Sequence, residues 1–348
     1  MTDDVLEVEN LRKYFKRGGG VKDMVFGRSP EPIKAVDDVS FALAENESIG
    51  VIGESGCGKS TLLMTLMGLH DKTGGTIRLD GREMSEFSRA DWKEYRRKVQ
   101  IIFQDPFNSL DPRMSVRSTL MEPLNIHDMD DKEERIRDIL EQVELQPADQ
   151  YLYRRPKQLS GGEKQRVSIA RALVLEPDVL LADEPVSMLD VSTQASILRL
   201  LSRLMDETGV SMVYISHDLS TVSYVCDVIN VMYLGRVVEQ APTEALISDP
   251  QHPYSQALMQ AIPVPSPHGE RERTEMEGAP RDPIGLGEGC RFRDRCPDRM
   301  EVCDETPYFV DVSEETDVEG HRAACHLYYD HEATDATERV DGEPVSRI

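Results

Sequence analysis

The sequence predicts an α/β fold built on a mainly parallel sheet, and three observations lead to that prediction. Residues 48–52, SIGVI, form a short apolar run that leads into the glycine-rich stretch 53–61, GESGCGKST. A helical, apolar stretch follows directly at 62–67. Further along the chain, apolar strand-like runs alternate with segments of helical spacing. Strands that alternate with helices after such a loop typically form a parallel sheet with helices on both faces.

The stretch 53–61 has the pattern G-x-x-x-x-G-K-S between a strand and a helix, which is typical of a phosphate-binding loop. Its glycines let backbone N–H groups approach phosphate oxygens, and the N-terminal end of the next helix favours the same anion. Lys59 can reach the terminal phosphates, and the Ser60 hydroxyl can bind Mg²⁺. We therefore expect a nucleoside triphosphate site formed by Gly53, Ser55, Gly56, Gly58, Lys59, Ser60 and Thr61.

Composition limits the classes of partner. The chain has 348 residues, with 64 acidic and 40 basic side chains and a net charge of −24. This acidity argues against nucleic acid as a partner, because phosphate backbones need basic patches. Because the acidity is spread along the chain, we also expect a halophilic source with a salt-rich cytoplasm. Neither a signal peptide nor a run of 18 apolar residues is present, so we expect an intracellular protein that does not span a membrane.

The first hundred residues are expected to supply strands around the loop. Residues 5–10 alternate apolar and acidic side chains, as in a half-exposed strand. The glycine-rich, basic segment 16–32 is predicted to be a loop insertion. Further strands are predicted at 33–43, at 48–52, within 74–81 and at 99–104.

Residues 105–171 are expected to form a mostly helical insertion. Prolines mark loops near its start, and apolar residues recur at helical spacing within 132–143 under a charged face. A strand–helix alternation then resumes. Its expected elements are a fully apolar strand at 179–183, a helix at 191–205, and strands at 211–216 and 228–233.

Two further stretches have residues suited to phosphate chemistry. Asp183 and Glu184 end the apolar strand, where one carboxylate can hold Mg²⁺ and the second can polarise an attacking water. The stretch 159–166, LSGGEKQR, places Ser160, Gly161 and Gly162 before a helix at 167–175, which makes a second anion-binding turn. Two chains that face each other head to tail would each complete the other's site.

LSGGEKQR, followed by VLLADEP at 179–185, resembles the signature motif and Walker B strand of the ABC-transporter ATPases, and the resemblance covers about residues 6–262. It implies a RecA-like parallel-sheet core with a β subdomain and a helical subdomain. It also implies an ATPase that binds ATP and Mg²⁺. In such a dimer, each ATP would lie between residues 53–60 of one subunit and residues 160–162 of the other.

The same resemblance implies further site residues where this chain matches the family. Gln104, in IIFQDP, resembles the Q-loop glutamine that senses Mg²⁺ and the γ-phosphate, and His217, in YISHD, resembles the switch histidine. Asp190, in SMLD, resembles the D-loop aspartate, although Met188 replaces the usual small residue. Phe15 is expected to stack on adenine, with Tyr14 as the alternative.

Together these residues form the expected catalytic and metal-binding sets. The catalytic residues are expected to be Lys59, Gln104, Glu184 and His217, and the Mg²⁺ ligands Ser60, Gln104 and Asp183.

Three stretches resemble one importer subfamily, which transports oligopeptides and dipeptides or nickel. They are QDPFNSLDPRM at 104–114, HPYSQAL at 252–258 and GCRFRDRCP at 289–297. The resemblance implies a peripheral protein on the cytoplasmic face of the membrane, bound to two transmembrane permease subunits and to a second ATPase subunit. An extracytoplasmic substrate-binding protein would act indirectly. The insertion at 18–28 resembles the second of two ATPase subunits in such importers. A nickel importer and a soluble, non-transport ABC ATPase remain the alternatives.

The remainder of the chain divides by composition into a linker at 263–288, a cysteine-bearing domain at 289–329 and an acidic tail at 330–348 that is expected to be disordered. Four clustered thiols in a reducing cytoplasm suggest a metal centre. Their gaps lack the C-x-x-C pairs of structural zinc, and four thiolates also suit a [4Fe–4S] cluster. The subfamily resemblance favours iron–sulfur over Zn²⁺. The expected ligands are Cys290, Cys296, Cys303 and Cys325, whereas Cys57 and Cys226 are expected to be packing thiols.

Overall fold

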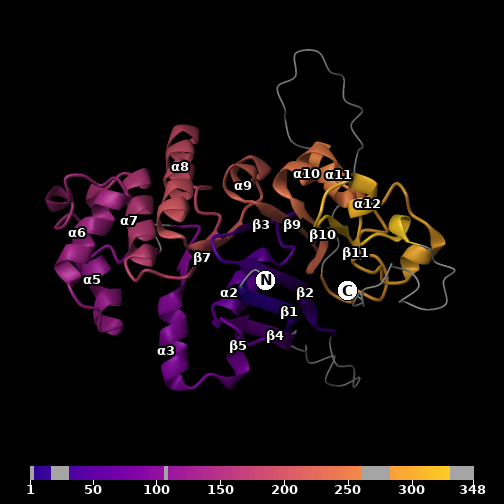
Figure 1. The fold of residues 1–348 in the computed structure, drawn as a ribbon, viewed down its shortest axis with the longest axis horizontal. Coiled ribbons are helices and arrows are strands. Elements are labelled where there is room, and N and C mark those ends of the chain that lie inside the picture. Colours follow the sequence, from indigo (N-terminus) through magenta and orange to yellow (C-terminus); the bar gives the residue numbers. More distant parts are fainter. Residues whose placement is uncertain (1–3, 17–30, 106–108, 261–282, 330–348) are drawn as a thin grey trace, which may run out of the picture. The chain divides into compact units, whose positions relative to one another are not determined.

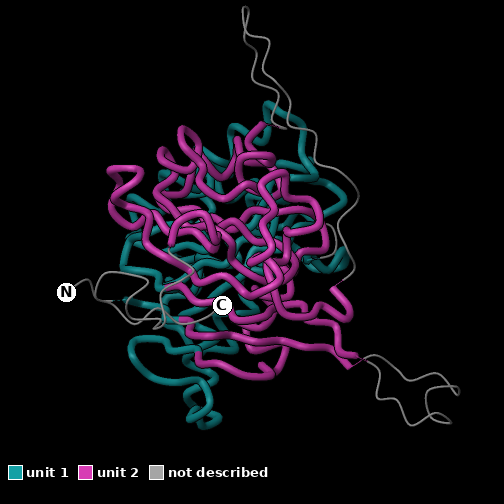
Figure 2. Tube along the Cα trace, turned by 90° about the vertical axis from the view of Figure 1, so that its right-hand side faces the viewer, with its two compact units in different colours: residues 1–7, 42–49, 77–216 teal, residues 8–41, 50–76, 217–348 magenta. Residues whose placement is uncertain are grey.

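The computed structural model describes residues 4–16, 31–105, 109–260 and 283–329. Figure 1 labels its helices and strands and follows the chain by colour. The contacts divide the chain into two compact units, which Figure 2 colours separately. The first unit comprises residues 1–7, 42–49 and 77–216, and the second comprises residues 8–41, 50–76 and 217–348.

The first unit contains the parallel strands that the sequence predicts. Strands β6 (Val99–Ile102), β7 (Val179–Asp183) and β8 (Ser211–Ile215) pair in parallel, with β7 in the middle. Every residue of β7 and β8 is buried. Their continuous apolar sequence is what strands covered on both faces require.

Helices make up most of the rest of the first unit. Helix α3 has a strongly charged sequence, with only Tyr95 buried, and it begins with a reciprocal capping box between Ser88 and Asp91. The segment after residue 108 is helical, as its spacing predicts. The helices described in this unit are α3 (Arg89–Lys98), α5 (Val116–Ile126), α6 (Lys132–Gln142), α7 (Gly161–Leu173) and α8 (Val191–Thr208).

Strand β3 (Ser48–Ile52) starts in the first unit, beside β8, and its last residues belong to the second. In the second unit it lies beside β9 (Val228–Tyr233), which turns back into β10 (Arg236–Pro242). These two strands are antiparallel, so the sheet is not parallel throughout. Helix α2 (Lys59–Leu66) follows β3, and the other helices described in this unit are α9 (Leu219–Val225), α10 (Thr243–Ser248), α11 (Pro253–Gln260) and the short α12 (Ser313–Thr316).

The cysteine-bearing segment adds strands to the same sheet in the second unit. Strand β12 (Arg322–Ala323) pairs antiparallel with β10, and β11 (Val310–Asp311) pairs antiparallel with β12. A small apolar cluster of Tyr308, Val310, Val312 and Ala323 packs there. The segment is therefore continuous with the sheet of the second unit.

A second sheet has the strand order β2-β1-β4-β5, and each of its first three strands begins in one unit and ends in the other. Strand β1 extends to Phe15, beyond the predicted end at residue 10. The strands are β1 (Asp4–Phe15), β2 (Ile33–Ala44), β4 (Gly74–Leu79) and β5 (Arg82–Glu83).

Parts of the predicted organisation fall outside the described residues: most of the loop insertion at 16–32, most of the linker and the whole acidic tail. Across the part of the chain that the structure does describe, no helix combines the length and the apolar character needed to cross a lipid bilayer.

Candidate active site

The phosphate loop lies in the second unit and depends on glycine at two positions. Gly53 and Gly58 have φ angles of 152° and 113°, in the region that only glycine enters easily. A Cβ added to Gly58 would lie 1.9 Å from the carbonyl oxygen of Ala35, and one added to Gly53 would lie 2.1 Å from that of Met232. The loop therefore packs so closely on β2 and β9 that side chains are excluded.

Helix α2 begins at the end of this loop with Gly58 at its N-cap, and glycine has no side chain that could cap the helix. The first N–H groups of a helix need partners, and an anion can supply them. Ser55, Gly56 and Ser60 are exposed beside these N–H groups. This is the arrangement that a phosphate group requires.

Lys59 lies within the loop that precedes it. The residue is 6% exposed, and its Nζ donates hydrogen bonds to the carbonyl oxygens of Gly53 at 2.7 Å and Glu54 at 3.1 Å. A weaker contact joins Nζ to Cys57 Sγ at 3.8 Å. The carbonyl groups of the loop thus decide where the ammonium group lies.

The two aromatic residues predicted as alternatives for adenine stacking, Phe15 and Tyr14, make different contacts. The half-buried ring of Phe15 stacks edge-on against His70, with 5.4 Å between centroids. The Tyr14 hydroxyl instead donates a hydrogen bond to Asp37. Burial and this bond raise the pKa of Tyr14 to about 12. Tyr14 is thus committed to a structural contact.

In the first unit, the carboxyl ends of β6 and β7 bring together residues predicted to act in hydrolysis. Asp183, the last residue of β7, is 6% exposed. Glu184 follows with a φ angle of 45°, which is uncommon for a residue with a side chain. Its carboxylate accepts a hydrogen bond of 2.8 Å from Nε2 of Gln104, which follows β6. Two of the predicted catalytic residues are therefore in direct contact.

The signature turn caps helix α7 in the same unit. Ser160 is the N-cap, its Oγ accepts from the Glu163 N–H at 3.2 Å, and its own N–H donates to Glu163 Oε2 at 2.7 Å. A Cβ on Gly162 would lie 2.7 Å from the methyl carbon of Thr193 on helix α8, whereas one on Gly161 would have ordinary contact. The capping hydrogen bonds and the close packing of Gly162 on α8 thus fix the turn, while Ser160 remains exposed.

Asp190 serves first as the N-cap of helix α8. Its carboxylate accepts hydrogen bonds from the N–H of Thr193 and from the hydroxyl groups of Ser192 and Thr193. These bonds hold the pKa of Asp190 well below its usual range. Nearby, Met188 is 60% exposed and Val191 is 81% exposed. Large apolar side chains in the open beside Asp190 indicate a surface suited to a partner.

His217 follows β8, belongs to the second unit and is exposed. The predicted residues therefore divide between the units. The second unit holds Phe15, residues 53–61 and His217. The first unit holds Gln104, residues 160–162, Asp183, Glu184 and Asp190.

The four C-terminal cysteines share one neighbourhood. The Cys290 N–H donates to the Cys303 carbonyl oxygen at 2.9 Å. Burial raises the pKa of Cys325 to about 12, and the thiols of Cys290, Cys296 and Cys303 add to the rise. Nevertheless, among the residues with described positions, no three His, Cys, Asp or Glu side chains form a group that could hold a metal ion. The expected metal centre is therefore not visible as a set of ligands around one ion.

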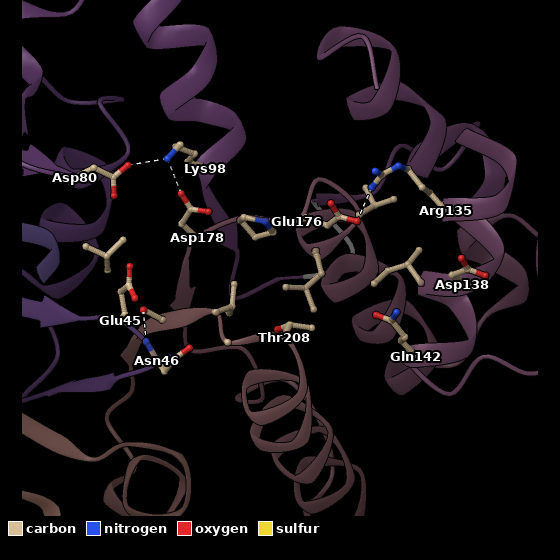
Figure 3. A pocket seen from close by; sticks show the side chains of 18 residues that line it. Glu45, Asn46, Asp80, Lys98, Arg135, Asp138, Gln142, Glu176, Asp178 and Thr208 are labelled. Carbon is tan, nitrogen blue, oxygen red and sulfur yellow. Dashed lines mark hydrogen bonds and ion pairs between the residues drawn. The ribbon is translucent and has the colours of Figure 1, made fainter. Parts of the chain in front are cut away.

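The first unit also has a hollow of about 800 Å³ at the opposite ends of its strands (Figure 3). Lys98 and Asp178, which precede β6 and β7, line it. Its charges are largely paired: Lys98 bridges Asp80 and Asp178, and Arg135 pairs with Glu176. Because Asp183 and Gln104 follow the other ends of β7 and β6, this hollow is separate from the predicted catalytic residues.

Two residues that hold the loop, Glu54 and Tyr254, have no role among those predicted from the sequence. The Glu54 N–H donates to the hydroxyl oxygen of Tyr254 at 2.9 Å, and the Glu54 carbonyl oxygen contacts Lys59. Glu54 occupies a position of the loop pattern at which any residue is allowed, and Tyr254 lies 200 residues away. A local sequence pattern cannot reveal such a pair, although the stretch HPYSQAL does contain Tyr254.

The phosphate loop, the Gln104–Glu184 pair and the signature turn define an ATPase of the ABC class. Residues 36–187 match the family described as "ABC transporter", and residues 238–303 match "Oligopeptide/dipeptide transporter, C-terminal region". The oligopeptide transport ATP-binding protein AppF of Bacillus subtilis is 40% identical over 333 residues, which is 94% of this chain and 98% of that protein. A putative peptide import ATP-binding protein of Brucella ovis is 45% identical over 297 residues, 84% of this chain and 92% of that protein.

Solved structures agree with this classification. The dimeric ATP-binding cassette MJ0796, in a post-hydrolysis state bound to ADP and Pi, has a TM-score of 0.59 and 30% identity, and the match covers 68% of this chain and 98% of that one. The cbiO1 protein from Clostridium perfringens, part of an ABC transporter complex, has a TM-score of 0.59 and 28% identity, covering 71% and 92%. The chain belongs to the family of ATP-binding proteins of ABC transporters.

Proposed function

We propose that this chain is the ATP-hydrolysing subunit of an importer for dipeptides or oligopeptides. The observation that supports this cargo most directly is the match of residues 238–303 to the C-terminal region of oligopeptide and dipeptide transporters. The names of the relatives from Bacillus and Brucella point the same way. Nickel import is the second candidate, because the resemblance in the sequence covers both cargoes.

The proposed partners follow from this role. The chain would bind two transmembrane permease subunits at the cytoplasmic face of the membrane, and an extracytoplasmic binding protein would deliver the cargo. A second ATPase subunit, identical or related, would face the exposed Ser160 turn and the exposed Met188 and Val191. The dimeric cassette among the similar structures supports this arrangement.

In the proposed mechanism, the loop 53–61 binds the phosphates of ATP and Phe15 stacks on adenine. Glu184 accepts a proton from the attacking water, and the hydrogen bond from Gln104 holds its carboxylate in one orientation. Lys59 and His217 stabilise negative charge on the transferred phosphoryl group. Residues Ser160, Gly161, Gly162 and Asp190 of the second subunit close the site.

Magnesium fits the donor groups of the chain. The Ser60 hydroxyl, the Gln104 carbonyl and the Asp183 carboxylate would hold it, and all three are the oxygen donors that this hard cation prefers. Bound there, Mg²⁺ would neutralise charge on the phosphates.

Reconstitution with the permeases tests the function. We expect the ATPase rate of the complex in vesicles to rise when binding protein and peptide are added, and labelled peptide to accumulate. A complex with Lys59→Ala in this chain should accumulate none. Stimulation and uptake with nickel, but not with peptide, would instead establish the second candidate.

We also propose that Cys290, Cys296, Cys303 and Cys325 hold a [4Fe–4S] cluster, with Zn²⁺ as the alternative. The thiols lie close enough to raise one another's pKa, yet they do not form a group around a single ion. The proposal rests on the number and type of the residues, because four Cys thiolates are the usual ligands of such a cluster. Anaerobic purification followed by iron, sulfide and zinc analysis tests this, with Cys296→Ser as the variant and Cys226→Ser as its control. Protein that contains neither iron nor zinc would rule out both metals.

The last proposal concerns the source: the net charge of −24 fits a salt-rich cytoplasm.

A further inference from the structure

Glu54, the second residue of the phosphate loop, is held through every polar group that it has. Its carbonyl oxygen accepts from Lys59 Nζ at 3.1 Å and from the Cys57 N–H at 3.2 Å. Its N–H donates to Tyr254. Its carboxylate accepts two hydrogen bonds of 3.0 Å, one from each terminal nitrogen of Arg295. The residue that binds the Glu54 carboxylate therefore also helps to fix the Glu54 carbonyl group, which accepts a hydrogen bond from Lys59.

Arg295 belongs to the cysteine-bearing segment and is firmly fixed. Its side chain is 8% exposed, and that of Glu54 is 21% exposed. Its Nη1 also donates to the Tyr233 hydroxyl oxygen at 3.2 Å. The centre of the guanidinium group lies 5.9 Å from the rings of Tyr233 and Phe292. The orientation of the Arg295 guanidinium group is fixed by its two hydrogen bonds to one carboxylate and by the two nearby rings, whereas an exposed ion pair has no such constraint.

A second arginine of the segment reaches the other side of the loop. Arg291 donates a hydrogen bond of 2.8 Å to the carbonyl oxygen of Leu234 and also pairs with the buried Asp37. The next residue, Gly235, donates its N–H to the Cys57 carbonyl oxygen at 2.8 Å. The cysteine-bearing segment thus contacts the loop directly through Arg295, and indirectly through Arg291 and the turn that contains Gly235.

We propose that Arg295 is a positioning residue for ATP binding. Through its two hydrogen bonds to Glu54, it fixes the loop carbonyl that places Lys59, and the cysteine-bearing segment thereby sets the affinity of the loop for ATP. The proposal rests on the ATP site described above. It differs from a purely stabilising role because it concerns the position of one ammonium group.

A double-mutant cycle on the full-length chain tests the proposal. We expect Arg295→Gln and Glu54→Gln each to raise the KM for ATP, and the Kd for a fluorescent ATP analogue, by about 10-fold. The value of kcat should fall by a smaller factor than the KM rises, because a displaced Lys59 keeps its charge and the variants do not touch Glu184 and Gln104. The double variant should be no weaker than either single variant.

Arg299→Gln is the matched control, because Arg299 lies in the same segment, is 47% exposed and pairs only with exposed or half-exposed carboxylates. We expect its KM to be unchanged. Arg295→Lys should lie between the wild type and Arg295→Gln, since lysine keeps the charge but not the two-pronged geometry.

Three results would overturn the proposal: an unchanged KM with only a lower melting temperature, full affinity in Arg295→Lys, or additive effects in the double variant. Failure of the ATP site itself would show differently. Lys59→Ala would then bind ATP normally, whatever the behaviour of Arg295.

Discussion

At the scale of single residues, the contact between Gln104 and Glu184 is the most informative one in the first unit. The two residues are 80 positions apart, and the carboxyl ends of neighbouring parallel strands bring them together. Because the amide of Gln104 donates to the carboxylate, Glu184 has one oxygen in a fixed position. A general base needs such a fixed orientation toward the water that it activates.

The change Glu184→Gln removes the basic group and keeps the shape of the side chain. We expect steady-state phosphate release to fall by about 10²-fold or more, while ATP binding remains within about 2-fold of the wild type. Glu176→Gln, which alters an exposed carboxylate of the same unit, is the control. Near-normal phosphate release by the first variant would exclude Glu184 as the base.

Gly58→Ala and Gly56→Ala compare two glycines of one loop. A Cβ at residue 58 would collide with the Ala35 carbonyl oxygen, whereas one at residue 56 would meet nothing within 4 Å. We expect a loss of about 2–4 kcal/mol in the free energy of unfolding for Gly58→Ala, with loss of ATP binding, and about 1 kcal/mol for Gly56→Ala. Chemical denaturation measures both, and equal losses would contradict the packing described here.

At the scale of elements, a buried carboxylate in the middle of β10 connects this strand to two other segments. Glu239 is fully buried and accepts hydrogen bonds from the N–H groups of Gln251 and His252, at 2.7 and 2.9 Å. One of its oxygens also lies 2.8 Å from Nε2 of His321. This cluster explains why β10 was not predicted. Its sequence places the ionisable Glu239 at a buried position, where residues distant in the sequence supply its hydrogen bonds.

Stability should fall between about pH 6.5 and pH 4 because of His252. Burial lowers the pKa of this histidine to about 4, and its Nδ1 must be unprotonated to accept the Tyr254 N–H at 3.0 Å. Between about pH 6.5 and pH 4, His252 is protonated in the unfolded chain but not in the folded chain. The free energy of unfolding therefore decreases by up to about 3 kcal/mol as the pH falls through this range.

Thermal unfolding across this range measures the effect. His252→Asn is the matched variant, because asparagine can accept the same N–H at the start of α11 without titrating. We expect a flatter pH profile for this variant. An identical slope in both proteins would assign the pH dependence to other groups.

At the scale of the whole molecule, the charge balance gives a salt prediction. With a net charge of −24, carboxylates repel one another at low ionic strength, and salt screens that repulsion. We expect the melting temperature to rise by about 5 °C or more between about 0.1 M and about 2 M potassium chloride, with ATPase activity rising in parallel. Full activity and stability without added salt would argue against a halophilic source.

The sequence predicts most of what depends on local patterns. The loop 53–61 and the buried strand 179–183 could be recognised because a single turn or a single strand determines which residue types occur in each. The charged helix α3 was missed because only Tyr95 is buried, although Ser88 and Asp91 form a capping box. The contacts of Arg295 with Glu54 could not be predicted, because only the folded second unit brings residues 241 positions apart together.

The pairing of β12 with β10 has a consequence for shortened chains. A protein that ended after α11 would leave one side of β10 as an open edge, with backbone N–H and C=O groups ready to pair with another molecule. It would also leave Glu239 buried without His321. Such a truncated ATPase should associate with itself as it is concentrated, and light scattering would detect this. If so, β12 covers the edge of β10 although it has only two residues.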